Sequence, residues 1–214
     1  MNLPNKITLA RICMIPVFVL MFFLENVPFN YGIAAILFLV LALTDALDGY
    51  IARKYNLITN LGKFLDPIAD KVLVSVAMIL LIALKSQLFS QFGTAQTAIY
   101  IITTVSACVI LARELIISAF RQIAASNGVV LAADKLGKYK TVVQDAALFV
   151  LLLATDIVGT VGVVLAWAGF GLFMLATVLT VWSGIAYVAN NGEVLKDKTE
   201  EKEADLEETA EIKE

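Results

Sequence analysis

Four aspartates within 26 residues are the side chains of this sequence best suited to chemistry. Asp45 and Asp48 stand near the end of one long apolar segment, and Asp66 and Asp70 stand near the start of the next. A carboxylate in a membrane-spanning segment costs about 2.5 to 3.5 kcal/mol on insertion scales, so bound cations are needed to compensate four of them. The chain contains no histidine, and both cysteines are remote from this stretch. Oxygen ligands suit hard ions, and we therefore expect Mg2+ or Mn2+ here.

The spacing of the aspartates places them on helix faces. At 100 degrees per residue, one stripe of the first helix holds Asp45, Asp48, Gly49, Ala52 and Arg53. Asp66 and Asp70 lie one turn apart on the second helix. Only a short polar connection at residues 54–60 separates the two helices, so we expect antiparallel neighbours whose aspartates meet at one end. Gly49 and Ala52 could serve close helix packing, but their place on the carboxylate face favours room for a nucleotide.

The complete pattern is Asp45-x2-Asp48-Gly49-x2-Ala52-Arg53-x8-Gly62-x3-Asp66-x3-Asp70. It resembles, without a departure, the signature of the CDP-alcohol phosphotransferase family. The resemblance implies that an alcohol displaces CMP from a CDP-linked lipid. It implies two metal ions held by Asp45, Asp48, Asp66 and Asp70. It also implies that Asp70 acts as the general base, although spacing alone does not distinguish Asp70 from Asp66 in this role. It further implies CDP contacts from Asp48, Gly49, Ala52, Arg53 and Gly62.

Three segments outside the signature bear on the acceptor alcohol. Residues 5–11, 62–71 and 137–141 resemble those of family members that make phosphatidylglycerophosphate. This implies transfer of a phosphatidyl group from CDP-diacylglycerol to glycerol 3-phosphate, with release of CMP. One alternative is a sibling enzyme that uses inositol phosphate, serine or a phosphatidylglycerol as acceptor. The other is a cation transporter, against which the aspartates argue because they lie near one membrane face rather than at the midplane.

A phosphate-bearing acceptor such as glycerol 3-phosphate needs cationic donors. The candidates on the same side as the aspartates are Arg113, Arg121, Lys135, Lys138 and Lys140. Arg113 is the strongest candidate because it lies inside an apolar segment, where an uncompensated cation is costly. A structural ion pair with Glu114 or a site aspartate would explain Arg113 equally well. The lysines could simply mark the cytoplasmic side of the membrane.

The composition predicts an integral membrane protein. Apolar residues make up 60% of the chain, and the mean hydropathy is +0.85. Six apolar stretches predict an all-α bundle of six transmembrane helices, beginning near residues 7, 31, 62, 97, 142 and 158, with an outer loop at 85–96. Pro67 could lie in the first turn of the third helix or one turn further in. Arg11 is expected to extend to the membrane surface.

Charge divides and orients the chain. Residues 1–191 carry 12 basic and 9 acidic side chains and form the predicted transmembrane domain, whereas residues 192–214 carry 4 basic and 10 acidic ones and form an acidic tail. The loops on one side of the predicted membrane contain one basic residue, Lys85, whereas the loops on the other side contain many. Because cytoplasmic loops are rich in lysine and arginine, we predict a cell-membrane protein with both termini and the aspartates in the cytoplasm. We also expect a homodimer that contacts membrane lipid and binds no nucleic acid.

Overall fold

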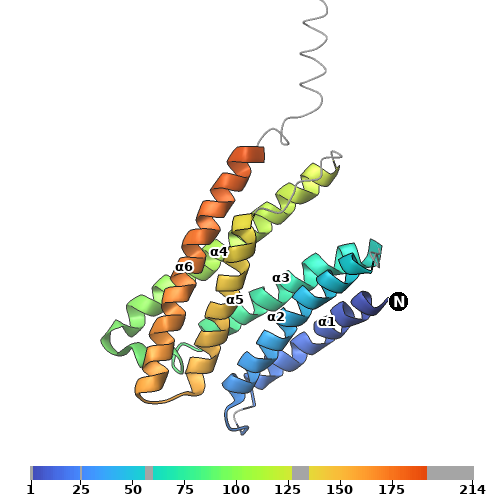
Figure 1. The fold of residues 1–214 in the computed structure, drawn as a ribbon. Helices are drawn as coiled ribbons and strands as arrows, with labels where there is room; N and C mark the ends of the chain where they lie inside the picture. The colour runs from blue at the N-terminus through green and yellow to red at the C-terminus, as the bar shows by residue number, and fades with distance from the viewer. Residues whose placement is uncertain (1, 25, 56–59, 127–134, 192–214) are drawn as a thin grey trace, which may run out of the picture.

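The protein is all-helical in the parts that its structure, a computed structural model, describes: residues 2–24, 26–55, 60–126 and 135–191. These ranges contain six α-helices, one 3-10 helix and no strand (Figure 1). In chain order the elements are α1 (Leu3–Met21), α2 (Asn30–Lys54), α3 (Asn60–Ala83), η1 (Phe89–Ala95), α4 (Gln96–Ser126), α5 (Lys135–Asp156) and α6 (Thr160–Asn191). The expectation of an all-α fold is confirmed.

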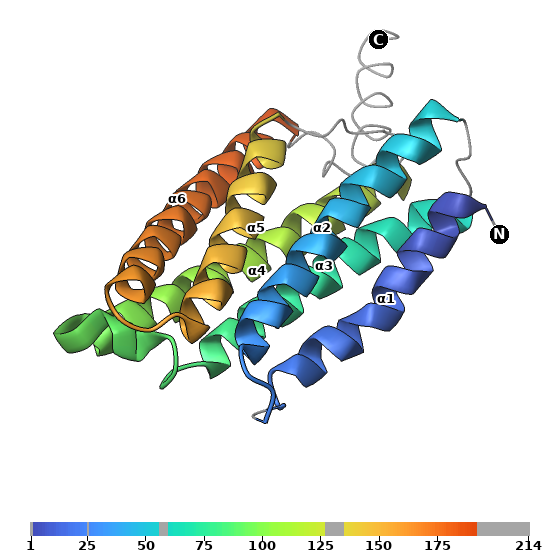
Figure 2. The ribbon, with the colours of Figure 1, turned by 60° about the horizontal axis from the view of Figure 1, so that its bottom comes forward.

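Successive helices run in opposite directions along one bundle. Figures 1 and 2 show that the start of α1, the end of α2, the start of α3, the end of α4, the start of α5 and the end of α6 lie toward the same end. The connecting residues 22–24, 26–29, 84–95 and 157–159 lie toward the opposite end. This alternation brings most of the residues with predicted chemistry to one end, which we call the site end.

Helix α2 is central to the part of the bundle that forms the site end. It contacts α1, α3 and α5, while α6 packs against α5 and α4. Large apolar side chains fill the interior: Phe18, Phe38, Met78 and Leu148 are fully buried, and the rings of Phe18 and Phe38 lie 6.1 Å apart. Buried alanines on α2, α3 and α5 let the helices approach closely, as small residues do in membrane bundles.

Two helical segments among the described residues are long and apolar enough to cross a membrane, Phe89–Ala125 and Thr160–Asn191. Shorter apolar helical segments are Asn30–Asp45 and Lys71–Ala83. By this criterion the fourth and sixth predicted spans are supported. The remaining four predicted spans are helical, but those of their residues that the structure describes do not meet it.

Two local features refine or correct the expectations from sequence. The expected outer loop at 85–96 contains the 3-10 helix η1, because Phe89 and Phe92 are buried and draw this segment onto α4 and α6. Helix α3 begins at Asn60, so Pro67 lies about two turns inside the helix rather than in its first turn.

Candidate functional site

The signature aspartates lie on two helices that contact each other. Asp45 and Asp48 belong to the second half of α2, and Asp66 and Asp70 to the first half of α3, so both pairs lie toward the site end. The predicted helical placement of the four residues is therefore confirmed. Of their side chains the structure describes that of Asp45. The structure describes only the backbone, and not the side chains, of Asp48, Asp66 and Asp70 and of the predicted nucleotide contacts Gly49, Ala52, Arg53 and Gly62.

Asp45 forms an ion pair with Arg11. The Nη1 group of Arg11 on α1 donates a hydrogen bond to Oδ1 of Asp45 on α2. The Arg11 side chain is completely buried, whereas 34% of the Asp45 side chain is exposed. The expectation that Arg11 extends to the surface was wrong, because a carboxylate inside the bundle compensates its charge.

A cleft of about 450 Å³ opens beside Asp45. Its walls come from α1, α2, α3 and α5, and its polar lining consists of Arg11, Asp45, Lys138, Thr141 and Asp145. The carboxylates of Asp45 and Asp145 give it oxygen donors, which suit Mg2+ or Mn2+. Within the described ranges no group of three or more acidic, cysteine or histidine side chains is placed to hold a metal ion. Asp45 fits the role of one metal ligand, and a complete set needs the aspartates of α3.

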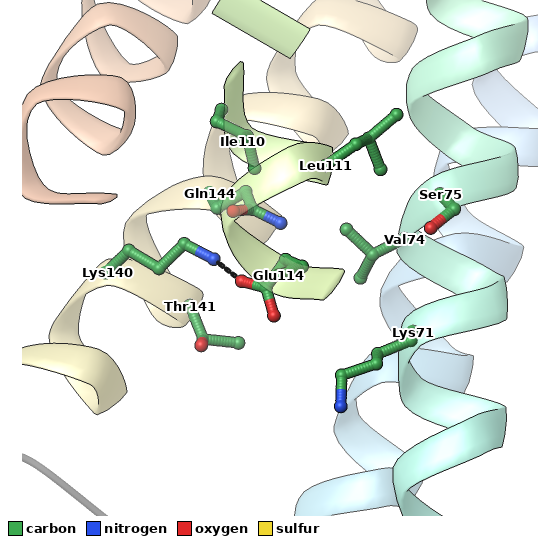
Figure 3. A pocket seen from close by; sticks show the side chains of 9 residues that line it. All are labelled: Lys71, Val74, Ser75, Ile110, Leu111, Glu114, Lys140, Thr141 and Gln144. Atoms are coloured by element: carbon green, nitrogen blue, oxygen red, sulfur yellow. Dashed lines mark hydrogen bonds and ion pairs between the residues drawn. The ribbon is translucent and has the colours of Figure 1, made fainter. Parts of the chain in front are cut away.

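A charged cluster lies next to this cleft, around Glu114 of α4 (Figure 3). Lys140 of α5 is 1% exposed and donates a hydrogen bond to Oε1 of Glu114. Glu114 and Lys140 line a small pocket together with Thr141 and Gln144 of α5, and Lys71 of α3 lines it from the opposite side. Because Val74 and Thr141 line both the pocket and the cleft, the charged cluster lies next to the cleft that contains Asp45.

Arg113 joins this cluster from the side of α6. Its Nη1 lies 3.6 Å from Oε1 of Glu114, and its Nη2 donates a 2.9 Å hydrogen bond to the hydroxyl of Ser183. The side chain also lines an apolar groove between α4 and α6. The ion pair with Glu114, foreseen as an alternative role for Arg113, is therefore present.

The other predicted acceptor cations occupy different surroundings. Lys138 lines the Asp45 cleft. Arg121 lies beyond the cluster, where its Nε donates a 3.1 Å hydrogen bond to the Tyr187 hydroxyl and its guanidinium stacks over the ring. The Lys135 side chain lies outside the described residues. Lys138 thus lines the Asp45 cleft, and Lys140 lines the adjoining pocket. Arg113 lines the groove between α4 and α6, and Arg121 binds α6.

Sequence reasoning did not assign site roles to Arg11, Lys71 or Asp145. Asp145 and Lys71 belong neither to the aspartate signature nor to the predicted acceptor-binding cations. The signal that could have identified Asp145 is its helical spacing from Lys138 and Thr141, which puts the three residues on one face of α5. Asp156 at the end of α5 accepts a 2.6 Å hydrogen bond from the amide of Gly32 at the opposite end of the bundle. It thereby caps the start of α2.

The fold and site together define a class of protein: a helical bundle that brings aspartates from two neighbouring helices to one end, beside buried cations. A sequence model described as CDP-alcohol phosphatidyltransferase matches residues 1–186, and the chain belongs to this family of enzymes.

Curated relatives agree in length and name. A Bacillus subtilis protein named CDP-diacylglycerol--glycerol-3-phosphate 3-phosphatidyltransferase is 41% identical over 206 residues, which cover 91% of this chain and 97% of the relative. Proteins of the same name are 39% identical in Escherichia coli K12, over 88% of this chain and 93% of theirs, and in Rickettsia bellii, over 87% and 93%. The chain is therefore similar to these enzymes along nearly their whole length.

Proposed function

We propose that this enzyme transfers a phosphatidyl group from CDP-diacylglycerol to glycerol 3-phosphate, giving phosphatidylglycerophosphate and CMP. The observation that carries the proposal is the 39 to 41% identity to enzymes of that name over about nine tenths of the chain. The unbroken aspartate signature supports the same reaction class. Family membership argues against the cation transporter considered from the buried carboxylates alone.

The reaction takes place at the membrane in this account, with all six α-helices as spans. Large apolar side chains on α4 and α6, including Val105, Leu115 and Trp182, are more than half exposed, and lipid rather than water would cover them. The basic residues gather at the site end, which therefore faces the cytoplasm together with both termini. The homodimer, the acidic tail at 192–214 and the absence of a nucleic-acid partner stay predictions.

The aspartates divide the chemical work. Asp45, Asp48, Asp66 and Asp70 hold two divalent ions, Mg2+ or Mn2+. Such ions supply charge neutralisation for the pyrophosphate and for the leaving CMP. A chain without histidine needs a carboxylate as general base, and the resemblance to the family assigns to Asp70 the role of accepting the proton of the attacking hydroxyl. Arg11 holds Asp45 in the wall of the cleft, and the CDP contacts come from Gly49, Ala52, Arg53 and Gly62 beside Asp48.

The acceptor phosphate binds among the cations beside the cleft. Lys138 borders the cleft itself, and Lys140 and Arg113 lie in the adjoining charged cluster. A dianionic phosphate held there by charge-assisted hydrogen bonds would leave the acceptor hydroxyl directed toward Asp45 and the α3 aspartates. Lys135 and Arg121 would contribute at longer range.

An acceptor panel tests the proposed substrate. Purified protein receives CDP-diacylglycerol and a divalent cation, and CMP release is measured with glycerol 3-phosphate, serine, inositol phosphate or phosphatidylglycerol. We expect CMP release with glycerol 3-phosphate to exceed that with the other three acceptors. Faster CMP release with another acceptor would show that glycerol 3-phosphate is not the preferred substrate, while the reaction would still be a CDP-alcohol phosphotransfer.

A further inference from the structure

Glu114 contacts two of the cations predicted to bind the acceptor phosphate. Its Oε1 accepts a hydrogen bond from Lys140 and lies 3.6 Å from Nη1 of Arg113. The Glu114 carboxylate is itself anionic and would repel a phosphate. Any contribution of Glu114 to phosphate binding must therefore act through the two cations.

The burial of Lys140 shows why it needs this partner. Its side chain is 1% exposed, and Arg113 beside the same carboxylate is 17% exposed. Burying a charge is costly unless it is paired, and two neighbouring cations also repel each other. Glu114 offsets both effects and so keeps two positive charges close together in one fixed arrangement.

The cluster connects four helices at the site end. Glu114 and Arg113 come from α4, Lys140 from α5 and Lys71 from α3, and Arg113 is held from α6 by the hydroxyl of Ser183. Lys71, Arg113 and Lys140 together exceed the charge of Glu114 by two. These four side chains therefore carry a net positive formal charge, and their pocket shares Val74 and Thr141 with the cleft that contains Asp45.

We propose that Glu114 is a positioning residue, which holds Lys140 and Arg113 in place for the phosphate of the acceptor alcohol. The inference rests on the proposed function, because that function supplies a phosphate-bearing acceptor. Glu114 touches neither substrate. Its loss lets the Lys140 amine and the Arg113 guanidinium adopt other positions, which weakens acceptor binding and leaves the binding of the CDP-lipid unchanged.

The test compares steady-state kinetics of the purified full-length protein with its Glu114→Gln and Glu114→Asp variants. CMP release is measured while glycerol 3-phosphate and CDP-diacylglycerol are varied in turn. Ser118→Ala is the matched control, because it removes the hydrogen bond from the Ser118 hydroxyl to the backbone carbonyl of Glu114, one turn back along α4, and leaves the Glu114 carboxylate in place. In Glu114→Gln, Lys140 or Arg113 would lose its charge-assisted contact with the acceptor phosphate. This loss predicts a rise of about tenfold or more in the apparent KM for glycerol 3-phosphate.

The conservative variant separates positioning from general support of the fold. Glu114→Asp keeps the negative charge but places it one methylene further from Lys140 and Arg113, so we expect a smaller rise in the KM for glycerol 3-phosphate and no rise in that for CDP-diacylglycerol. If Glu114→Gln does not accumulate, the Glu114→Asp result alone tests the positioning role. An unchanged or lower KM for glycerol 3-phosphate, or equal losses toward both substrates, would overturn the role of Glu114. A wild-type enzyme that releases no CMP with glycerol 3-phosphate would instead overturn the proposed function on which the role depends.

Discussion

The guanidinium of Arg11 on α1 is ion-paired with the carboxylate of Asp45 on α2. The two residues are 34 positions apart, and the pair attaches the first helix to the helix that carries half of the aspartate signature. A helix outside the signature therefore contributes directly to the placement of a predicted metal ligand.

Replacing Arg11 with methionine should destabilise the protein. The substitution keeps a long side chain but removes the charge that compensates Asp45. We expect a loss of about 1 to 3 kcal/mol, less than for a fully buried pair because 34% of the Asp45 side chain is exposed. Thermal unfolding in detergent measures the effect, with Lys6→Met on an exposed position of α1 as control. Equal midpoints for the two variants would show that the ion pair contributes nothing to stability.

The helices were predictable from sequence because each is a long apolar stretch bounded by polar residues. The predicted sixth span began at 158 and α6 begins at Thr160, and the third began at 62 and α3 begins at Asn60. The short polar connection at 54–60 likewise predicted that α2 and α3 are neighbours.

Side-chain partners were harder to predict. Lys140 is 26 positions from Glu114, and no local spacing rule reports a pairing between helices at that separation. Arg11 was expected at the surface for the same reason, since its partner lies on another helix. The buried phenylalanines of η1 have an apolar pattern too short to distinguish a 3-10 helix from a loop.

Substituting Arg113 tests acceptor binding. Arg113→Ala should raise the apparent KM for glycerol 3-phosphate by roughly tenfold or more, with a smaller change for CDP-diacylglycerol, because a charge-assisted contact to phosphate is lost. Ser183→Ala is the matched control, since it removes the hydrogen bond to Arg113 and keeps the charge. If Arg113→Ala folds and its kinetics are unchanged, the role of Arg113 is confined to its ion pair with Glu114.

Two glycines of α6 should respond differently to alanine. A Cβ atom at Gly169 would lie 2.8 Å from Cγ of Leu151 on α5 and 3.2 Å from the Leu151 backbone nitrogen, whereas one at Gly171 would meet no atom within 4 Å. Overpacking predicts that Gly169→Ala lowers stability by about 1 to 3 kcal/mol. Gly171→Ala should be neutral or slightly stabilising, because alanine favours helix. Equal thermal midpoints for the two variants would contradict the close packing of α5 on α6.

Cysteine labelling tests the orientation in the membrane. Cys13 and Cys108 are free and exposed, so both are first replaced by serine. An impermeant thiol reagent added to intact cells should then label a Lys85→Cys variant and leave a Tyr55→Cys variant unlabelled, since these residues lie at opposite ends of the bundle. Labelling of the Tyr55→Cys variant from outside would reverse the proposed topology.

The most direct test of the account is CMP release from CDP-diacylglycerol by the purified protein, with and without glycerol 3-phosphate. The account predicts release that depends on both glycerol 3-phosphate and a divalent cation, stops in EDTA, and is abolished by Asp48→Asn, Asp66→Asn or Asp70→Asn while each variant remains in the membrane. Full turnover in EDTA, or CMP release that is unaffected by these three substitutions, would contradict it.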